Sequence, residues 1–167
     1  MTLDQAKAYL RIESGGEDAL IGALLASAIG VCEAFIGSAL VRRDVAETLA
    51  ADGRWQRLRV APVEAIVAVE QVDPSGTASA LSPPSYAVDI DGAGEGWVRA
   101  PGMRVRVRYV AGLSPDAAGV PAAIAQGVIR LVAHLYASRD DAKAPPAAVA
   151  ALWRPFRRVR LARERRA

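Results

Sequence analysis

Apolar residues recur at helical spacing in three segments of the chain, which are 2–11, 17–37 and 121–139. Thr2 is a suitable cap for the first helix, and Pro121 is tolerated at the start of the third. In the second segment two apolar stripes lie side by side, so that they occupy most of the helix circumference. The pattern therefore predicts three main helices, with the second as the central helix of the core.

Between these helices, residues 40–110 have the composition of short strands. The clearest strand is Met103–Val110, in which apolar side chains alternate strictly with arginines. Successive side chains of a strand point to opposite faces, so the apolar set is expected to face a core. The opposite face then presents Arg104, Arg106 and Arg108. The sequence thus predicts an α+β fold, in which a helical core carries an inserted small antiparallel β module.

The C-terminal part of the chain changes in composition. Pro145 and Pro146 rule out a continuous helix, so a Pro/Ala linker is expected over 142–151, between a main domain at 1–141 and an arm at 152–167. The arm holds seven arginines and one glutamate, and its charge of +6 against +3 for the whole chain leaves −3 on the remainder. The basic character is therefore confined to one terminus.

Aromatic and aliphatic residues are interleaved with the arginines of this arm. Tryptophan and arginine together are typical of protein interface anchors, so docking on another protein is the favoured interpretation. Neutralisation of DNA phosphates and a plain solvated tail are the alternatives. The residues expected to dock are Trp153, Arg154, Phe156, Arg157, Arg158, Arg160, Arg163, Arg165 and Arg166.

The arginine face of the strand Met103–Val110 has two interpretations as well. Three guanidinium groups in a row suit contact with DNA phosphates or with the acidic side chains of a neighbouring subunit, whereas an ordinary solvated face needs no partner. A hydrophobic fraction of 52% and a positive mean hydropathy are high for a solvated monomer. This composition indicates subunit interfaces.

The residue types needed for catalysis are scarce. Cys32 is the single cysteine and His134 the single histidine, so neither an internal disulfide nor a zinc site of the usual Cys/His kind can form. His134 lies on a polar helix stripe without a marked serine partner, and Asp140 with Asp141 lacks a third acid. We therefore expect no enzymatic activity, no cofactor and no metal.

Two further classes of site are not expected. The loop Asp89–Ala100 has acids where a calcium loop begins, but it ends on alanine where the bidentate glutamate should stand. The longest charge-free apolar run, Ala19–Cys32, has fourteen residues, fewer than the roughly 20 that a spanning helix needs. No membrane partner is expected.

In their order along residues 2–141, six segments resemble the head-tail connector (adaptor, head completion) proteins of tailed bacteriophages and gene transfer agents. The most specific parts are the valine-rich strand that runs into Tyr109 and the helix with LVAHLY at its centre. The six segments are LDQAKAYLRI, EDALIGALLASAIGVCEAFIG, PVEAIVAVEQVDPSG, SYAVDI, VRVRYVAGL and VPAAIAQGVIRLVAHLYASRDD.

The resemblance implies a structural subunit without an active site. Copies would assemble as a ring, with a dodecamer the expected form, beneath the portal of the particle and would extend the DNA channel towards the tail. The implied partners are the portal protein, a tail-side connector, stopper or tail terminator protein, further copies of the chain, and the DNA that passes through. The expected location is the particle neck, after assembly in the bacterial cytoplasm, with the C-terminal arm engaging the portal.

Overall fold

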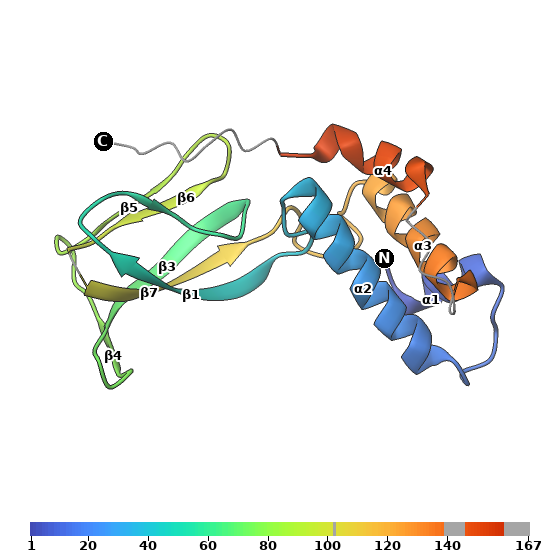
Figure 1. Cartoon of the computed structure of the whole chain (residues 1–167), viewed down its shortest axis with the longest axis horizontal. Coiled ribbons are helices and arrows are strands. Elements are labelled where there is room, and N and C mark those ends of the chain that lie inside the picture. The colour runs from blue at the N-terminus through green and yellow to red at the C-terminus, as the bar shows by residue number, and fades with distance from the viewer. Residues whose placement is uncertain (102, 139–145, 159–167) are drawn as a thin grey trace. The chain divides into compact units, whose positions relative to one another are not determined.

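The computed structural model describes residues 1–101, 103–138 and 146–158, and Figure 1 labels most of their helices and strands. They divide into two units. The helical unit consists of Met1–Leu40 with the described part of Ser114–Val159, and the β unit is Val41–Leu113. The expected α+β class is confirmed, since the described residues form four α-helices and two small antiparallel sheets. The residues expected at the basic end of the arm, 159–167, lie outside the described part of the chain.

The helical unit contains four α-helices and one short 3-10 helix. Three of the α-helices match the expected segments to within a few residues, whereas the fourth lies partly where a linker was expected. The elements are α1 (Leu3–Leu10), α2 (Asp18–Ile36), α3 (Ala122–Ala137), α4 (Ala147–Trp153) and η1 (Arg154–Phe156).

Helix α1 begins with a capping box that the sequence places at Thr2. The Gln5 backbone N–H donates to the Thr2 hydroxyl at 3.2 Å, and the Thr2 N–H donates to the Gln5 side chain at 3.0 Å. Two backbone donors that a helix start leaves unpaired are thereby satisfied. Lys7 of α1 pairs with Asp18 at the start of α2, with Nζ 2.6 Å from Oδ1, so the two helices are also joined by charge.

The core of the helical unit lies between α2, α3 and α4, which pack against one another in Figure 1. Ile21 and Ile36 of α2 and Ile124 and Leu131 of α3 are almost completely buried. By length and composition alone, α2 is also apolar enough to cross a membrane. The core helix of a soluble protein passes the same test, and one face of α2 is packed within the unit.

Cys32 is buried on that packed face of α2. Burial raises the pKa of its thiol from 9.0 to about 12, with the Glu33 carboxylate adding to the shift. The reactive form of a cysteine is the thiolate, so this side chain acts as a small core residue, as expected, and not as a nucleophile.

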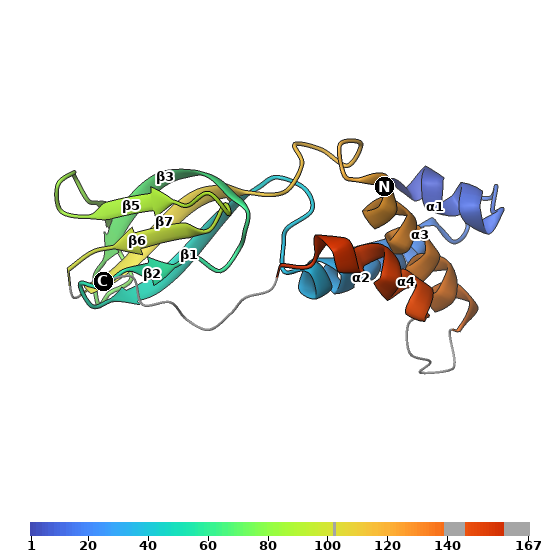
Figure 2. The same cartoon turned by 90° about the horizontal axis from the view of Figure 1, so that it is seen from above.

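The β unit is built from two antiparallel sheets. The larger sheet has the strand order β1-β7-β3-β4 and the smaller one the order β2-β6-β5 (Figure 2). The strands are β1 (Arg43–Ala51), β2 (Gln56–Arg57), β3 (Val63–Val72), β4 (Ala78–Ala80), β5 (Ala87–Ile90), β6 (Gly96–Arg99) and β7 (Met103–Ala111).

Strand β7 is a central strand of the larger sheet and shows the alternation that its sequence predicts. Val105, Val107 and Tyr109 are fully buried, and they form a core with Leu58 and Val98. The side chain of Met103, which the sequence places on the same face, lies outside the described residues. The arginines of β7 occupy the other face, so the alternation of apolar residues and arginines determines which face of the sheet is exposed to solvent.

One buried carboxylate is held in the core of the β unit. The Tyr109 hydroxyl donates to Glu47 Oε2 at 2.9 Å and accepts the Val60 N–H at 3.2 Å. The Arg59 N–H also donates to Glu47 Oε2, at 2.9 Å, and its guanidinium lies 3.3 Å from Oε1. Burial, together with the nearby carboxylate, raises the pKa of Tyr109 above its ordinary value, so the phenol stays a donor. The network ties β1 and β7 to the segment after β2.

Replacing Tyr109 with phenylalanine is expected to lower the free energy of unfolding by about 1–3 kcal/mol, because Glu47 and the Val60 N–H lose a buried partner. Urea denaturation of the full chain measures the change. Tyr86→Phe is the matched control, because no hydrogen bond of the Tyr86 hydroxyl is found among the described residues, and it should shift stability by no more than about 0.5 kcal/mol. Equal effects of the two substitutions would contradict the role given to the network.

Candidate interaction surfaces

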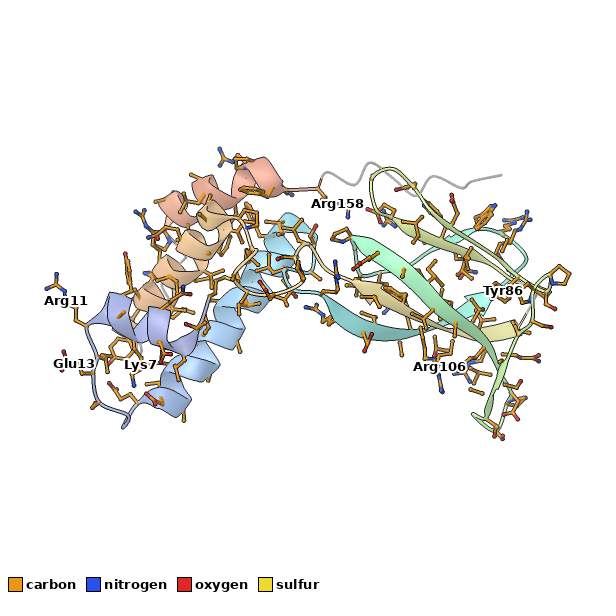
Figure 3. All side chains as sticks on the ribbon, turned by 180° about the vertical axis from the view of Figure 1, so that it is seen from behind. Lys7, Arg11, Glu13, Tyr86, Arg106 and Arg158 are labelled. Atoms are coloured by element: carbon orange, nitrogen blue, oxygen red, sulfur yellow. The ribbon has the colours of Figure 1, made fainter. Side chains whose placement is uncertain are left out.

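The first candidate surface is the outer face of β7, defined by Arg104, Arg106 and Arg108. In Figure 3, Arg106 projects from the sheet on the side away from β5 and β6. The β1 residues opposite these arginines are Ala50, Thr48 and Ala46, which are small and exposed. Because the neighbouring side chains on β1 are short, they do not cover the guanidinium groups, which are accessible to a partner.

One acidic residue on β3 shares this face. Glu70 Oε1 lies 3.3 Å from Arg108 Nε, and Glu70 Oε2 lies 3.9 Å from an amino group of Arg106. Neither contact is enclosed, because the two arginine side chains remain 38% and 55% exposed, so each ion pair contributes little to stability. Arg104 is exposed and has no ion pair within the described ranges. The outer face of β7 thus keeps a surplus of positive charge.

The second candidate surface is the C-terminal segment, and its first aromatic residue is not on the surface. Trp153, at the end of α4, is 2% exposed, and its indole N–H donates to the Ile124 carbonyl of α3 at 3.2 Å. Its ring sits in a notch formed where α3 has a glycine, since a Cβ on Gly127 would lie 2.2 Å from Trp153 Nε1. Trp153 is therefore an anchor within the helical unit.

The residues after Trp153 continue along α2. The rings of Phe35 and Trp153 are 5.9 Å apart at an interplanar angle of 53°, and the Arg157 guanidinium lies 5.7 Å from the Phe35 ring. The Arg158 N–H donates to the Ile36 carbonyl at 2.9 Å, one of the carbonyls that the end of α2 leaves without a helical partner. The described chain is thus fastened to the C-terminal end of α2.

The residues expected to dock differ in how far they are exposed. Arg154 and Arg157 are exposed, while Phe156 and Arg158 are partly buried in the helical unit. Arg160, Arg163, Arg165 and Arg166 lie outside the described residues. Sequence reasoning missed the internal role of Trp153, although Gly127 was a signal, because a glycine inside an apolar helix costs stability unless close packing requires it.

Within the described part of the chain, the candidate catalytic and metal-binding residues form no cluster. Among the described ranges, no group of three His, Cys, Asp or Glu side chains could hold a metal ion. His134 lies in the last turn of α3, and Asp140 and Asp141 fall in the part that the structure leaves undescribed. Asp91 organises the turn between β5 and β6 by accepting the N–H groups of Ala93 and Glu95 at 3.0 and 2.9 Å. This geometry explains the DIDGAGEG sequence as a turn.

The fold defines a two-unit α+β protein, and the two surfaces described above are its candidate interaction sites. No protein-family model matches the chain, and no curated protein matches it. Among solved structures, the chain is similar to one in the neck of an empty gene transfer agent particle computed with C6 symmetry. That match has 27% sequence identity and a TM-score of 0.80, and it covers 99% of this chain and 93% of the other.

Two further structures agree with this match. A chain in the virion of a native gene transfer agent particle is 28% identical, with a TM-score of 0.78 over 99% of this chain and 93% of the other. A chain in the neck of a native particle computed with C12 symmetry is 29% identical, with a TM-score of 0.71 over 89% of this chain and 87% of the other. These matches confirm the expected resemblance to gene transfer agent proteins. They also confirm the particle neck as the expected location.

Proposed function

We propose that this chain is a structural component of the neck of a gene transfer agent particle. The observation that supports the proposal is the match to a neck chain along 99% of the sequence, with a TM-score of 0.80. Because both units are included, the correspondence is not limited to a common helical bundle or a common β sandwich. Necks computed with C6 and C12 symmetry contain repeated copies of their chains, which supports self-association here.

Within the neck, we assign the chain to a head-tail connector ring beneath the portal. The ordered segments that resemble connector proteins support this finer role, as do the contact faces described above. Its partners would be the portal protein, a tail-side connector, stopper or tail terminator protein, and further copies of itself. In this role the chain contributes position and contact area and performs no chemical reaction.

The charged surfaces have distinct places in this proposal. The outer face of β7 carries accessible positive charge, which suits the DNA channel or an acidic face of a neighbouring subunit. The C-terminal arm is assigned to the portal, with Arg154 and Arg157 exposed beside the helical unit. Trp153 stabilises the base of the arm and does not itself dock, because its ring is buried.

The test is a deletion of the gene in the bacterium that encodes this chain, complemented with an affinity-tagged copy. Purified particles should contain the tagged chain, and electron microscopy should place it in the neck. Without the chain, we expect heads and tails that fail to join and gene transfer that falls by orders of magnitude. Tailed particles with normal transfer in the deletion strain would contradict the proposed function.

The same strain tests the arm. A chain that ends at Arg158 keeps the contacts described above for Trp153 and Phe35, so it should fold, yet it loses Arg160, Arg163, Arg165 and Arg166. If the arm engages the portal, the shortened chain should be depleted from the particles. Replacing those four arginines with lysines serves as the matched control, because it keeps the length and the charge of the arm. It removes only the planar bidentate fork of arginine. Full occupancy of the shortened chain would refute the role of the arm.

A nucleic-acid-binding module is the second candidate, favoured by the exposed Arg104, which has no ion pair with another described residue, and by the basic C-terminus. Binding to random duplex DNA over a salt series separates the two functions. A connector that only lines a channel should bind weakly at physiological salt. A nucleic-acid-binding module should bind tightly at low salt, with a steep salt dependence that disappears when residues 159–167 are removed.

A further inference from the structure

Helix α2 has an apolar face that the described residues leave uncovered. Its buried side is formed by Ile21, Leu25, Ala28, Cys32 and Ile36. The opposite side is exposed over about two-fifths of the helix circumference at 3.6 residues per turn. The members of this uncovered face of α2 are Ala19, Leu20, Ala23, Ala26, Ser27, Gly30, Val31 and Ala34.

The composition of the uncovered face of α2 is unusual for a surface in water. The sequence has no charged residue between Asp18 and Glu33, and Ser27 is the sole polar residue on the face. Leu20 is 36% exposed and Val31 45% exposed. A solvated helix normally carries charged side chains on its outer side, and contiguous exposed apolar surface marks a contact site.

Resting on the proposed function, we propose that the uncovered face of α2 binds a second copy of this chain within the neck ring. In a closed ring each copy presents one face to the next, so that every such face is covered once and none remains in water. The chains of similar structure come from necks with C6 and C12 symmetry, where a neighbouring copy is always present at the same rotation. A second copy is therefore a partner available to every α2.

The chemistry of the uncovered face of α2 fits a protein neighbour better than DNA or lipid. DNA binding requires cations, and this face has none. A membrane-spanning helix would be surrounded by lipid, yet the other side of α2 is packed against α3 and α4 in the helical unit. A helix that lies on a membrane surface is typically rich in Lys or Arg, and α2 has neither. The alanine, glycine and serine side chains of this face are short, so the backbone of a helix or strand of the neighbour can approach closely.

The structure also supplies a substitution that separates assembly from folding. A Cβ added to Gly30, on the uncovered face of α2, meets no atom within 4 Å, and the same holds for Gly22, which lies on α2 beyond the edge of that face. Glutamate is a better helix former than glycine at either position, so both variants should fold at least as well as the parent chain. A charge at position 30 would be trapped against the neighbouring copy, whereas one at the half-buried position 22 would lie outside the uncovered face.

The experiment compares Gly30→Glu with Gly22→Glu in the complemented deletion strain. We expect Gly30→Glu to be depleted from purified particles by at least about tenfold, because an unpaired charge is buried at every contact of the ring. Gly22→Glu should be incorporated as the parent chain is. Thermal unfolding of both purified variants verifies that they fold. Normal incorporation of Gly30→Glu would overturn the inference.

Photocrosslinking identifies the occupant directly. A diazirine amino acid in place of Leu20 should, on irradiation of intact particles, give a product with the mass of two copies and peptides of this chain alone. A product with another neck protein, with lipid, or no product in particles that contain the chain would overturn the inference and leave the proposed function intact. Absence of the tagged parent chain from the particles would overturn both.

Discussion

Replacing Trp153 with alanine is expected to lower the free energy of unfolding of the helical unit by about 3–5 kcal/mol, the usual cost of deleting a buried aromatic ring. The indole is 2% exposed, and its removal also leaves the Ile124 carbonyl without its donor. Helix α4 and the segment to Arg158 should then lose their main attachment. Circular dichroism during urea denaturation measures the change, and an unaffected transition midpoint would contradict this arrangement.

The matched test of the notch uses Gly127. Alanine is the better helix former by about 1 kcal/mol, but here its Cβ would lie 2.2 Å from Trp153 Nε1, so Gly127→Ala should destabilise the unit by about 1–3 kcal/mol. Gly22→Ala gains the same helix propensity in open space and should stabilise. In the Trp153→Ala background the penalty at Gly127 should disappear, because the clash partner is gone.

Replacing Gly112 with alanine is expected to cost the β unit about 4 kcal/mol or more, which places it among the most damaging substitutions of one residue. An added Cβ would lie 2.4 Å from the Cα and N atoms of Arg42 and 2.6 Å from the Val41 carbonyl carbon. These are backbone atoms, which cannot rotate away as a side chain can. The Gly112 N–H also donates to the Pro62 carbonyl at 2.9 Å, so the segment after β7 is held on two sides.

Gly76→Ala controls for the loss of glycine flexibility. Gly76 has a φ of +92°, and an added Cβ there meets no atom within 4 Å, so the substitution carries the conformational penalty of about 1–2 kcal/mol without a clash. Near-ultraviolet circular dichroism of the two variants distinguishes the effects, since Gly112→Ala should lose the packing of Tyr109 and Gly76→Ala should keep it. Similar stabilities would show that the approach of Arg42 to Gly112 is not tight.

The periodic segments were predictable from the sequence because burial follows their periods directly. Val105, Val107 and Tyr109 face the core as the alternation in β7 requires, and α2 is the long apolar helix expected at 17–37. Helix α4 was missed because two prolines were taken as the sign of a linker. Pro146 instead precedes the first turn of α4, a position where proline costs no hydrogen bond.

The surfaces were harder to predict, because exposure depends on which distant segments meet. The spacing of Trp153 among arginines is the same whether its ring anchors a partner or fills the notch at Gly127 of its own chain. Likewise, the charge row on β7 was evident, but the pairing of Glu70 with Arg106 and Arg108 depends on the register of β3 beside β7. The partners of the chain followed from its resemblance to neck proteins and not from any single residue.

The hydrogen bond from Arg158 to Ile36 fixes the origin from which the last residues extend. Nine residues follow Arg158 in the sequence, and a chain advances by at most about 3.3–3.6 Å per residue. The last arginines therefore reach no farther than about 30 Å from the C-terminal end of α2. In a density map of the particle, any acidic surface proposed as the target of the arm has to lie inside that radius extended by the length of one arginine side chain.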